Sequence, residues 1–573
     1  MTNLVIDLLV LILVLMTTGI VLYGWGNLAW RCLGMSSPTN PSSLTIWLGF
    51  CFVLSVVEFI HLFVPINWRV TITMMVLGLI GFRHQKRSLV QSILQTLLAT
   101  IKQYPWQAII VTVMIVLWCL RAMAVPNNYD SGLYHFQSIR WLNEEPIVLG
   151  LGNLHWRLAL NQAYFGFLAL LNFAPYWNKG YAAGGLFLLL LTLLTIFQIA
   201  QKQSTKWKYS IGLLLFLSLG FVAASTVNPS PDNAVTLLEI VLFIYLMSLT
   251  QTAVTGEHQD PNFVHCAAAT LFLCMTVVLT KFSSVGFAIG LVFCLALLLV
   301  RLKLLAGVVN LRMIIVLCVF ICVHVVSGYL LSGAPLFPST LLGAWDLSWA
   351  VPKQVAISET ELIFSWARRP GLEFANQSGL TEGWFVAWLS AISPLTKLIF
   401  TLSIVLTFIN IVRVWKNKET NGRSVEYLLY LPIITGLTFW FITAPDVRFL
   451  GALLILFFAL SIYFTFISQN KNKQLESKVQ RVLSTSHIQL LIFTIVSLIS
   501  LKYLGMNSLA HSGWSIVTPA ITENRQTKSG QKIKVPALGN QCWDSALPCA
   551  SIFNDALRKE STKMHTIFSV KSE

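Results

Sequence analysis

The stretch AIIVTVMIVLWCLRAMA, residues 108–124, and the segment NNYDSGLYH, residues 127–135, decide how this chain is interpreted. The first is an apolar run long enough to cross most of a bilayer as a helix. The second places a carboxylate, a phenol and an imidazole at the end of that run. Ionisable groups at the boundary between lipid and water usually mark chemistry or recognition. The two segments together predict a membrane helix that opens into a functional loop.

The composition indicates that the rest of the chain is also embedded in a membrane. Of its 573 residues, 56% are hydrophobic and only 11% are charged, and apolar runs recur from end to end. Lipid cannot hydrogen-bond a backbone and no run alternates like a barrel strand, so we expect the spans to be helices. The first run, Leu4–Tyr23, lacks the basic start and the cleavage site of a signal peptide. We therefore expect it to be a retained helix.

The fold class predicted is an all-α polytopic membrane protein with about 12–14 transmembrane helices. The candidate spans are Leu4–Tyr23, Leu44–Val64, Val70–Phe82, Ala108–Ala124, Tyr181–Ala200, Tyr209–Thr226, Ala234–Leu249, Val264–Thr280, Ser284–Val300, Met313–Leu331, Pro394–Val412, Tyr427–Ala444, Leu450–Ile467 and Ile488–Leu504. We divide the chain into N-terminal helices (residues 1–106), a transmembrane core (107–504) and a C-terminal tail (505–573).

The net charge of +16 comes from short Lys and Arg clusters between the apolar runs. This distribution follows the positive-inside rule, so we place the clusters in the cytoplasm and expect no nucleic-acid partner. The loops 125–179 and 332–393 and the tail then lie outside. Leu158–Phe173 is apolar, but a crossing there would put the Lys202–Lys208 cluster outside. We expect this segment to be a helix in the outer interface.

Asp130 is the leading candidate for a functional carboxylate. The alternative is a helix N-cap, since an Asp before a helix satisfies free backbone N–H groups. Tyr134 and His135 follow four and five residues later, so in a helix they rise near the same face. A carboxylate beside a phenol and an imidazole suits a general base, or a metal or substrate ligand.

His155 and Arg157 form a second concentration, in the segment GLGNLHWR at residues 150–157. Glycines allow tight turns, and these two side chains could reach a phosphate or a sugar hydroxyl. The alternative is an interfacial turn anchored by Trp156, with Arg157 extending its charge toward water.

Asp232, Lys281 and Arg448 each stand at an outer end of a predicted span. Asp232 suits an N-cap before Ala234–Leu249 as well as a functional acid. Lys281 could hold an anionic lipid-linked phosphate, or its ammonium could simply extend toward water. Arg448 could reach a diphosphate, although an ion pair with Asp446 is the simpler interpretation.

Other motifs limit the chemistry. No Walker, dinucleotide, haem or nucleophile-elbow motif is present, so ATP-driven transport and cofactor redox reactions find no support. No metal-ligand spacing is recognised either, so the cofactor stays open and no motif requires a divalent metal. Cys542 and Cys549, with six residues between them, could form a disulfide if the tail faces an oxidising compartment.

This arrangement of an acid-bearing first outer loop, a second outer turn with Ser230-Pro231-Asp232 and an external tail resembles the GT-C superfamily. Those membrane glycosyltransferases take sugars from polyprenyl phosphate carriers. The chain is also similar, over most of its length, to a group of bacterial multi-pass membrane proteins. The shared motifs are Tyr129–His135, Gly150–His155, Ser339 after Pro338, Pro445–Phe449, Cys542-Trp543 and Pro548-Cys549.

The resemblance implies a GT-C-like bundle that transfers a sugar to a glycan, lipid or protein acceptor at the extracytoplasmic face of the cell (inner) membrane. Asp130 takes the place of the essential first-loop acid, with His135 and His155 beside it in catalysis. Substrate binding would fall to Tyr134, Arg157, Asp232, Lys281 and Arg448. The chain departs from the pattern because Ser131, not a second acid, follows Asp130. A surface-polysaccharide polymerase or ligase, or a lipid-linked oligosaccharide transporter, is the alternative.

Overall fold

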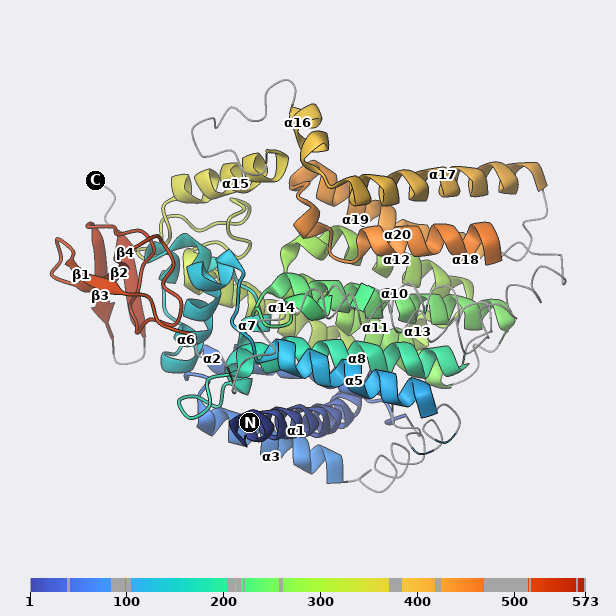
Figure 1. The fold of residues 1–573 in the computed structure, drawn as a ribbon, viewed down its shortest axis with the longest axis horizontal. Coiled ribbons are helices and arrows are strands. Elements are labelled where there is room, and N and C mark those ends of the chain that lie inside the picture. The colour runs from blue at the N-terminus through green and yellow to red at the C-terminus, as the bar shows by residue number, and fades with distance from the viewer. Residues whose placement is uncertain are drawn as a thin grey trace.

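The computed structural model describes residues 2–38, 42–83, 98, 102, 105–202, 212, 218–219, 222–256, 261–369, 384–417, 424–467, 514, 517–562 and 565–570. Within these residues the chain is mainly a bundle of long helices, drawn side by side in Figure 1. Four short strands lie at one end of the bundle, next to helix α6 (Phe136–Glu144). That end, which we call the loop end, carries the candidate site.

Nine helices of the described part are long and apolar enough to cross a membrane. They are α1 (Thr2–Cys32), α2 (Ser43–His61), α8 (Gly180–Lys202), α10 (Pro231–Thr255), α11 (Pro261–Thr280), the stretch Phe282–Arg301 that contains α12 (Val285–Arg301), α14 (Leu311–Ser332), α17 (Pro394–Asn417) and the stretch Val425–Thr443 that contains α19 (Tyr430–Thr443). Shorter apolar helices are α3 (Trp68–Phe82), α5 (Pro105–Ala122) and α20 (Leu453–Ile462).

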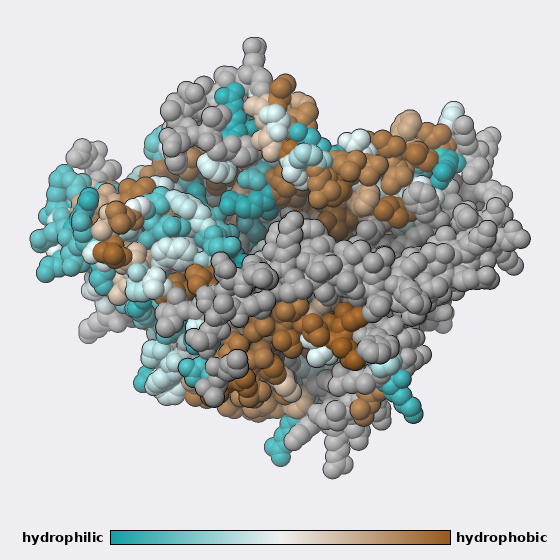
Figure 2. All heavy atoms as spheres, viewed as in Figure 1, coloured by the Kyte–Doolittle hydropathy of each residue, from teal (hydrophilic) through white to brown (hydrophobic). Residues whose placement is uncertain are grey.

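The chain is therefore a multi-pass membrane protein, as the composition predicted. Figure 2 shows apolar atoms over the helices and hydrophilic atoms gathered at the end that holds the strands. Two predicted spans, Ile488–Leu504 and most of Tyr209–Thr226, lie outside the described residues. The predicted runs Tyr427–Ala444 and Leu450–Ile467 are divided into short helices, including α18 (Ser424–Tyr427) and the π-helical turn η7 (Tyr463–Ile467).

The N-terminal helices pack closely because glycines remove side chains from their contacts. A Cβ on Gly24 would lie 1.7 Å from the carbonyl oxygen of Gly78, between α1 and α3. A Cβ on Gly49 would lie 1.8 Å from the carbonyl oxygen of Leu22, between α2 and α1. Small residues at such crossings let backbones approach, which is how membrane helices associate without a hydrophobic driving force. Residues 2–82 thus form a compact support for the loop end.

The first large loop is more folded than its sequence suggests. It contains the π-helical turn η2 (Ser131–His135), α6, the 3-10 turns η3 (Leu151–Asn153) and η4 (Trp156–Ala159), and α7 (Tyr164–Leu171). The interfacial helix expected at Leu158–Phe173 is limited to α7, and residues 164–170 of α7 are all buried. The loop is therefore part of the packed body.

The chain is mostly helical, as expected for an all-α polytopic fold, and the described part of the C-terminal tail adds four short strands. Strand β1 (Thr522–Gln526) pairs antiparallel with β2 (Lys532–Pro536), and β3 (Leu557–Ser561) pairs antiparallel with β4 (Thr566–Val570). Val535, Leu557 and Phe568 are buried. Only β2, with the sequence KIKVP, alternates polar and apolar residues as a half-buried strand does, whereas β1, with the sequence TENRQ, is polar throughout.

Candidate functional site

Two guanidinium groups hold the carboxylate of Asp130. Its Oδ1 lies 2.9 Å from Nη1 of Arg157, and its Oδ2 lies 2.9 Å from Nη1 of Arg448. The side chain of Asp130 is 11% exposed, that of Arg157 23% and that of Arg448 43%. Among the described residues Asp130 makes no capping hydrogen bond to the η2 turn. The carboxylate of Asp130 therefore binds side chains instead of capping a helix, and the interpretation of Asp130 as an N-cap is wrong.

Short capped turns present the two arginines. Arg157 is in η4, where the Nδ1 atom of His155 accepts its backbone N–H at 3.2 Å. Arg448 is in η6 (Val447–Leu450), where Oδ1 of Asp446 accepts its backbone N–H at 2.9 Å. Asp446 therefore caps the turn, and the guanidinium of Arg448 is directed to Asp130. The simpler interpretation, an ion pair between Asp446 and Arg448, is replaced by this arrangement.

Lys281 and Asp232 form a second ion pair beside the first. The N-cap of α10 is Ser230, whose hydroxyl accepts the backbone N–H of Asp232. The Asp232 carboxylate is therefore available to Lys281. Phe449 joins the two pairs, because Nζ of Lys281 lies 4.3 Å and Cζ of Arg448 4.8 Å from its ring centroid. The predicted residues Asp130, Arg157, Asp232, Lys281 and Arg448 thus meet in one cluster.

Glu359, in α15 (Lys353–Arg368), adds an acid that the sequence analysis missed. Its Oε1 lies 3.3 Å from Nε of Arg157, and its side chain is 3% exposed. Burial raises the pKa of Glu359, while the charge of Arg157 acts in the opposite direction. Within the described part of the chain, the cluster balances three acids (Asp130, Asp232 and Glu359) against three bases (Arg157, Lys281 and Arg448).

The carboxylates keep Arg448 fully charged. Burial alone would lower the pKa of this guanidinium, but Asp130 and Asp232 outweigh burial and raise it. A permanent positive charge at the edge of the site favours binding of an anion.

Tyr134 and His135 are buried under the cluster. Cζ of Arg157 lies 5.9 Å from the ring centroid of Tyr134. Burial raises the pKa of the Tyr134 phenol, and the nearby carboxylate of Asp130 adds to the rise. Burial lowers the pKa of the His135 imidazole to about 4, against the opposing pull of Asp130. At neutral pH these two groups are therefore an uncharged phenol and an uncharged imidazole.

His155 supports the cluster from one side. Besides capping η4, its ring stacks on Trp156 with 4.9 Å between the centroids. Burial lowers its pKa to about 3, and the charge of Arg157 lowers it further. A neutral, stacked and hydrogen-bonded imidazole fixes the turn that carries Arg157. These contacts give His155 a positioning task toward Arg157, and its role in catalysis stays a prediction.

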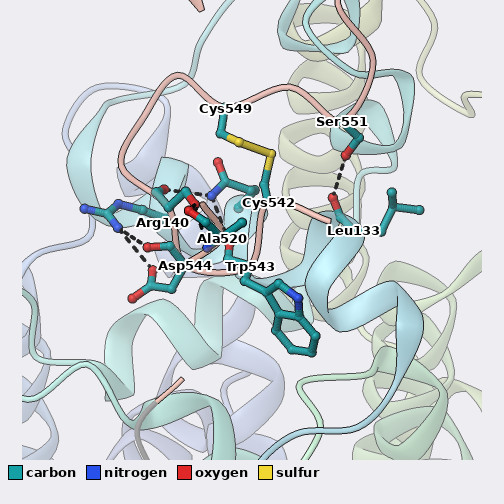
Figure 3. The surroundings of a disulfide bond; sticks show 10 residues. Leu133, Arg140, Ala520, Cys542, Trp543, Asp544, Cys549 and Ser551 are labelled. Atoms are coloured by element: carbon teal, nitrogen blue, oxygen red, sulfur yellow. Dashed lines mark hydrogen bonds and ion pairs between the residues drawn. A yellow bond between two sulfur atoms is a disulfide. The ribbon is translucent and has the colours of Figure 1, made fainter. Parts of the chain in front are cut away.

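The tail is attached to the segment that carries Asp130 (Figure 3). Nε2 of Gln137 donates to the carbonyl oxygens of Trp543 and Ser545 at 3.0 and 2.8 Å. Nη1 of Arg140 donates to the carbonyl oxygen of Asp544 at 2.7 Å. The loop that makes these contacts is closed by a disulfide between Cys542 and Cys549.

Trp543, in the tail, contacts the turn directly. Its backbone N–H donates to the carbonyl oxygen of Gly132 at 2.8 Å, and a Cβ on Gly132 would lie 2.6 Å from Cε2 of its ring. Trp543 has a φ of 47°, in the left-handed region that a bulky residue rarely adopts. Such a conformation persists when surrounding contacts over-determine it. The tail is therefore part of the wall around the Asp130 turn.

The described residues contain no group of three or more His, Cys, Asp or Glu side chains that could hold a metal ion. Each acid of the cluster is paired with a Lys or Arg side chain.

A comparison with known proteins gives one match. Residues 8–455 match a family model described as a domain of unknown function (DUF8201). No curated protein and no solved structure is significantly similar to the chain. The matched range includes Asp130, Arg157, Asp232, Lys281 and Arg448, and it ends before the tail.

Proposed function

The chain belongs to the DUF8201 family, and we propose that it is a glycosyltransferase that moves a sugar from a polyprenyl-phosphate-linked donor to an acceptor. We place the reaction at the extracytoplasmic face of the cell membrane, where the loop end would meet the headgroup region. The proposal rests on the two ion pairs that Asp130 forms with Arg157 and Arg448 at the end of a membrane-spanning bundle. Lys281 lies beside these pairs, on the ring of Phe449. The GT-C resemblance of the sequence supports the same reaction class.

The three cations of the cluster, Arg157, Lys281 and Arg448, would bind the phosphate of the donor. A guanidinium offers parallel N–H donors that match the oxygens of a phosphate as well as those of a carboxylate. Arg448 is the most exposed of the three cations, so an incoming phosphate would meet it first. Lys281 shares the ring of Phe449 with Arg448, which places an ammonium within the same anion site. A carrier phosphate bound here keeps its polyprenyl chain in the bilayer.

Asp130 needs to be freed before it can act as a base. Both oxygens of Asp130 are bonded to guanidinium groups, so neither is free to accept a proton from an acceptor hydroxyl. The donor phosphate competes for the same two arginines. We propose that its binding releases one or both oxygens of Asp130 toward the acceptor. Without a donor, Asp130 then stays paired with the two arginines.

The transfer itself is an in-line displacement. The acceptor oxygen forms a bond to the anomeric carbon while the bond from that carbon to the phosphate oxygen breaks. The bonding pair stays on the phosphate, where Arg157, Arg448 and Lys281 stabilise the added charge. The acceptor proton passes to Asp130. The sugar inverts its anomeric configuration, and Tyr134, a neutral hydrogen-bond donor next to Arg157, helps to orient the reactants.

The test uses the full chain in proteoliposomes with a radiolabelled polyprenyl-phosphate hexose as the donor. We expect the Asp130→Asn variant to insert and fold but to release at least a hundredfold less polyprenyl phosphate, since positioned general bases contribute roughly 10²–10⁴-fold. The control is Asp346→Asn, at an exposed aspartate outside the cluster. Undiminished release by Asp130→Asn, measured at equal protein, would refute the assigned role.

A further inference from the structure

A second polar site lies inside the bundle, on the other side of the loop from the charged cluster. A cavity of about 70 Å³ is bounded by α2, α6, α14 and the loop residues before α7. A single water needs roughly 10–15 Å³ on this scale, so the space exceeds that of one water. None of the cations of the cluster lines the cavity.

The cavity is surrounded by polar atoms without partners. Five side-chain atoms of its lining residues are buried and lack a hydrogen bond within the described part of the chain: Glu58 Oε2, His61 Nε2, Trp141 Nε1, Gln162 Oε1 and Ser327 Oγ. Buried polar groups are nearly always paired in folded proteins. So many unpaired atoms around one cavity indicate that a ligand or ordered water belongs there.

Glu58 is fixed in place by a histidine from another helix. Its Oε1 lies 2.8 Å from Nδ1 of His324, in α14, and the carboxylate is 9% exposed. This contact leaves only Oε2 for another partner. Ionisable groups inside a membrane bundle are costly and usually functional. The pair is therefore a second candidate site and not a continuation of the first.

The hydrogen-bonding capacity and charge of these five atoms limit which chemical class of ligand fits the cavity. Glu58 repels a phosphate or a carboxylate, which excludes the anion that the charged cluster suits. An ammonium would satisfy Glu58 and Gln162, but it offers no acceptor to the Trp141 N–H. A hydroxyl both donates and accepts, so a group with several hydroxyls satisfies the carboxylate, the amide oxygen and the indole together.

The position of the cavity indicates that the hydroxylated group belongs to a lipid. The carbonyl oxygen of His61, at the end of α2, accepts the backbone N–H of Ile147, so the cavity lies at the loop end. Phe59, next to Glu58 in α2, is 49% exposed, Phe63, just after the end of α2, is 55% exposed, and Val326 beside Ser327 is 44% exposed. Apolar side chains this exposed at the end of a membrane helix face acyl chains.

We propose that this cavity binds the neutral, hydroxylated headgroup of a lipid, such as a sugar or glycerol headgroup. Phe165 lies between the cavity and the cluster, with its ring centroid 5.4 Å from that of His135. A ligand in the cavity can thus affect the position of His135, below the cluster, through Phe165. The site stands on its own contacts and does not depend on glycosyl transfer.

Native mass spectrometry of the detergent-purified full chain tests the site, with no sugar donor present. The probes are monoglucosyl diacylglycerol, phosphatidylcholine with the same acyl chains, and free glucose. We expect the glucosyl lipid to be retained and phosphatidylcholine not to displace it. Glu58→Gln should reduce retention at least tenfold, since hydrogen bonds to charged groups are among the strongest. Trp141→Phe keeps the ring and removes only the N–H, and should weaken retention as well. Glu361→Gln, at an exposed glutamate, is the control.

Retention equal to that of phosphatidylcholine, or unchanged in both Glu58→Gln and Trp141→Phe, overturns the proposal. Displacement of the lipid by free glucose supports a sugar site and overturns its assignment to a lipid. Because transfer is not measured, failure here leaves the proposed function untouched, and loss of transfer in Asp130→Asn leaves this site untouched.

Discussion

Replacing Gly132 with alanine tests whether the tail determines the shape of the Asp130 turn. The added Cβ would lie 2.6 Å from Cε2 and 2.9 Å from Cδ2 of Trp543, and 2.9 Å from Nε2 of Gln541. The Trp543 backbone cannot shift away from the turn without breaking hydrogen bonds, because its N–H donates to Gly132 and its carbonyl oxygen accepts from Gln137. The clash must therefore separate the tail from the turn.

The size of the effect follows from two opposing terms. Overpacking a tight contact costs about 1–3 kcal/mol, whereas Ala in place of Gly in a helical turn stabilises by roughly 0.5–1 kcal/mol. The net cost is about 1–2 kcal/mol, which corresponds to a factor of about 5–30 in the undocked population.

Limited trypsin cleavage of the tail in membranes measures that population. When opening and closing are fast compared with cleavage, the cleavage rate follows the open fraction, so it should rise about 5- to 30-fold in Gly132→Ala. In a Trp543→Ala background the ring is gone, and Gly132→Ala should have no effect or a slight protective one. Gly307→Ala is the control, since its added Cβ would meet nothing within 4 Å. An equal factor in both backgrounds would show that the Gly132–Trp543 contact is not responsible.

Three further predictions concern the cluster and its supports. Arg448→Ala should weaken donor binding about tenfold, the low end for a hydrogen bond to a charged group, because Arg448 is 43% exposed. Arg448→Lys should recover part of the affinity. Equal donor Kd in equilibrium binding for all three proteins would contradict this. Burial lowers the pKa of His135 to about 4, so as the pH falls the unfolded chain takes up a proton before the folded chain does. The free energy of unfolding of the loop end should be full above about pH 6.5 and fall by about 3 kcal/mol as the pH decreases to 4. If His135→Asn leaves the acid profile of thermal unfolding unchanged, burial of His135 is not the cause. The double variant Cys542→Ser, Cys549→Ser removes a short covalent loop that stabilises the tail by roughly 2–3 kcal/mol. Trypsin should therefore cleave the tail faster in this variant, and also in the native chain under reductant. If neither change affects cleavage, the hydrogen bonds alone hold the loop.

The membrane character and the members of the charged cluster could be predicted from sequence because each leaves a local signal. Long apolar runs give the spans, and a charged residue at the end of such a run, as at Asp130, Lys281 and Arg448, is unusual enough to be noticed. What the sequence could not give is their pairing. Asp130 and Arg448 are 318 residues apart, and only the packing of the intervening helices decides that they meet.

The residues missed in the sequence are those whose local context is ordinary. Glu359 belongs to the amphipathic helix α15, where glutamate is common, and only its burial against Arg157 distinguishes it. Glu58 stands close to the end of α2, and its importance depends on His324 from a distant helix. His155 was noticed, but its type suggested chemistry, whereas its backbone contact gives it a structural task. The strands of the tail are too short for periodicity to separate them from loops.

The attachment of the tail to the turn has a consequence for how the protein is made. Residues 540–545 supply bonds to a turn synthesised some four hundred residues earlier. A truncated chain that ends at the last helix could insert all its spans and still lack the wall around Asp130. An unfinished copy in the bilayer would therefore carry Asp130 without the contacts that residues 540–545 make to the segment around it.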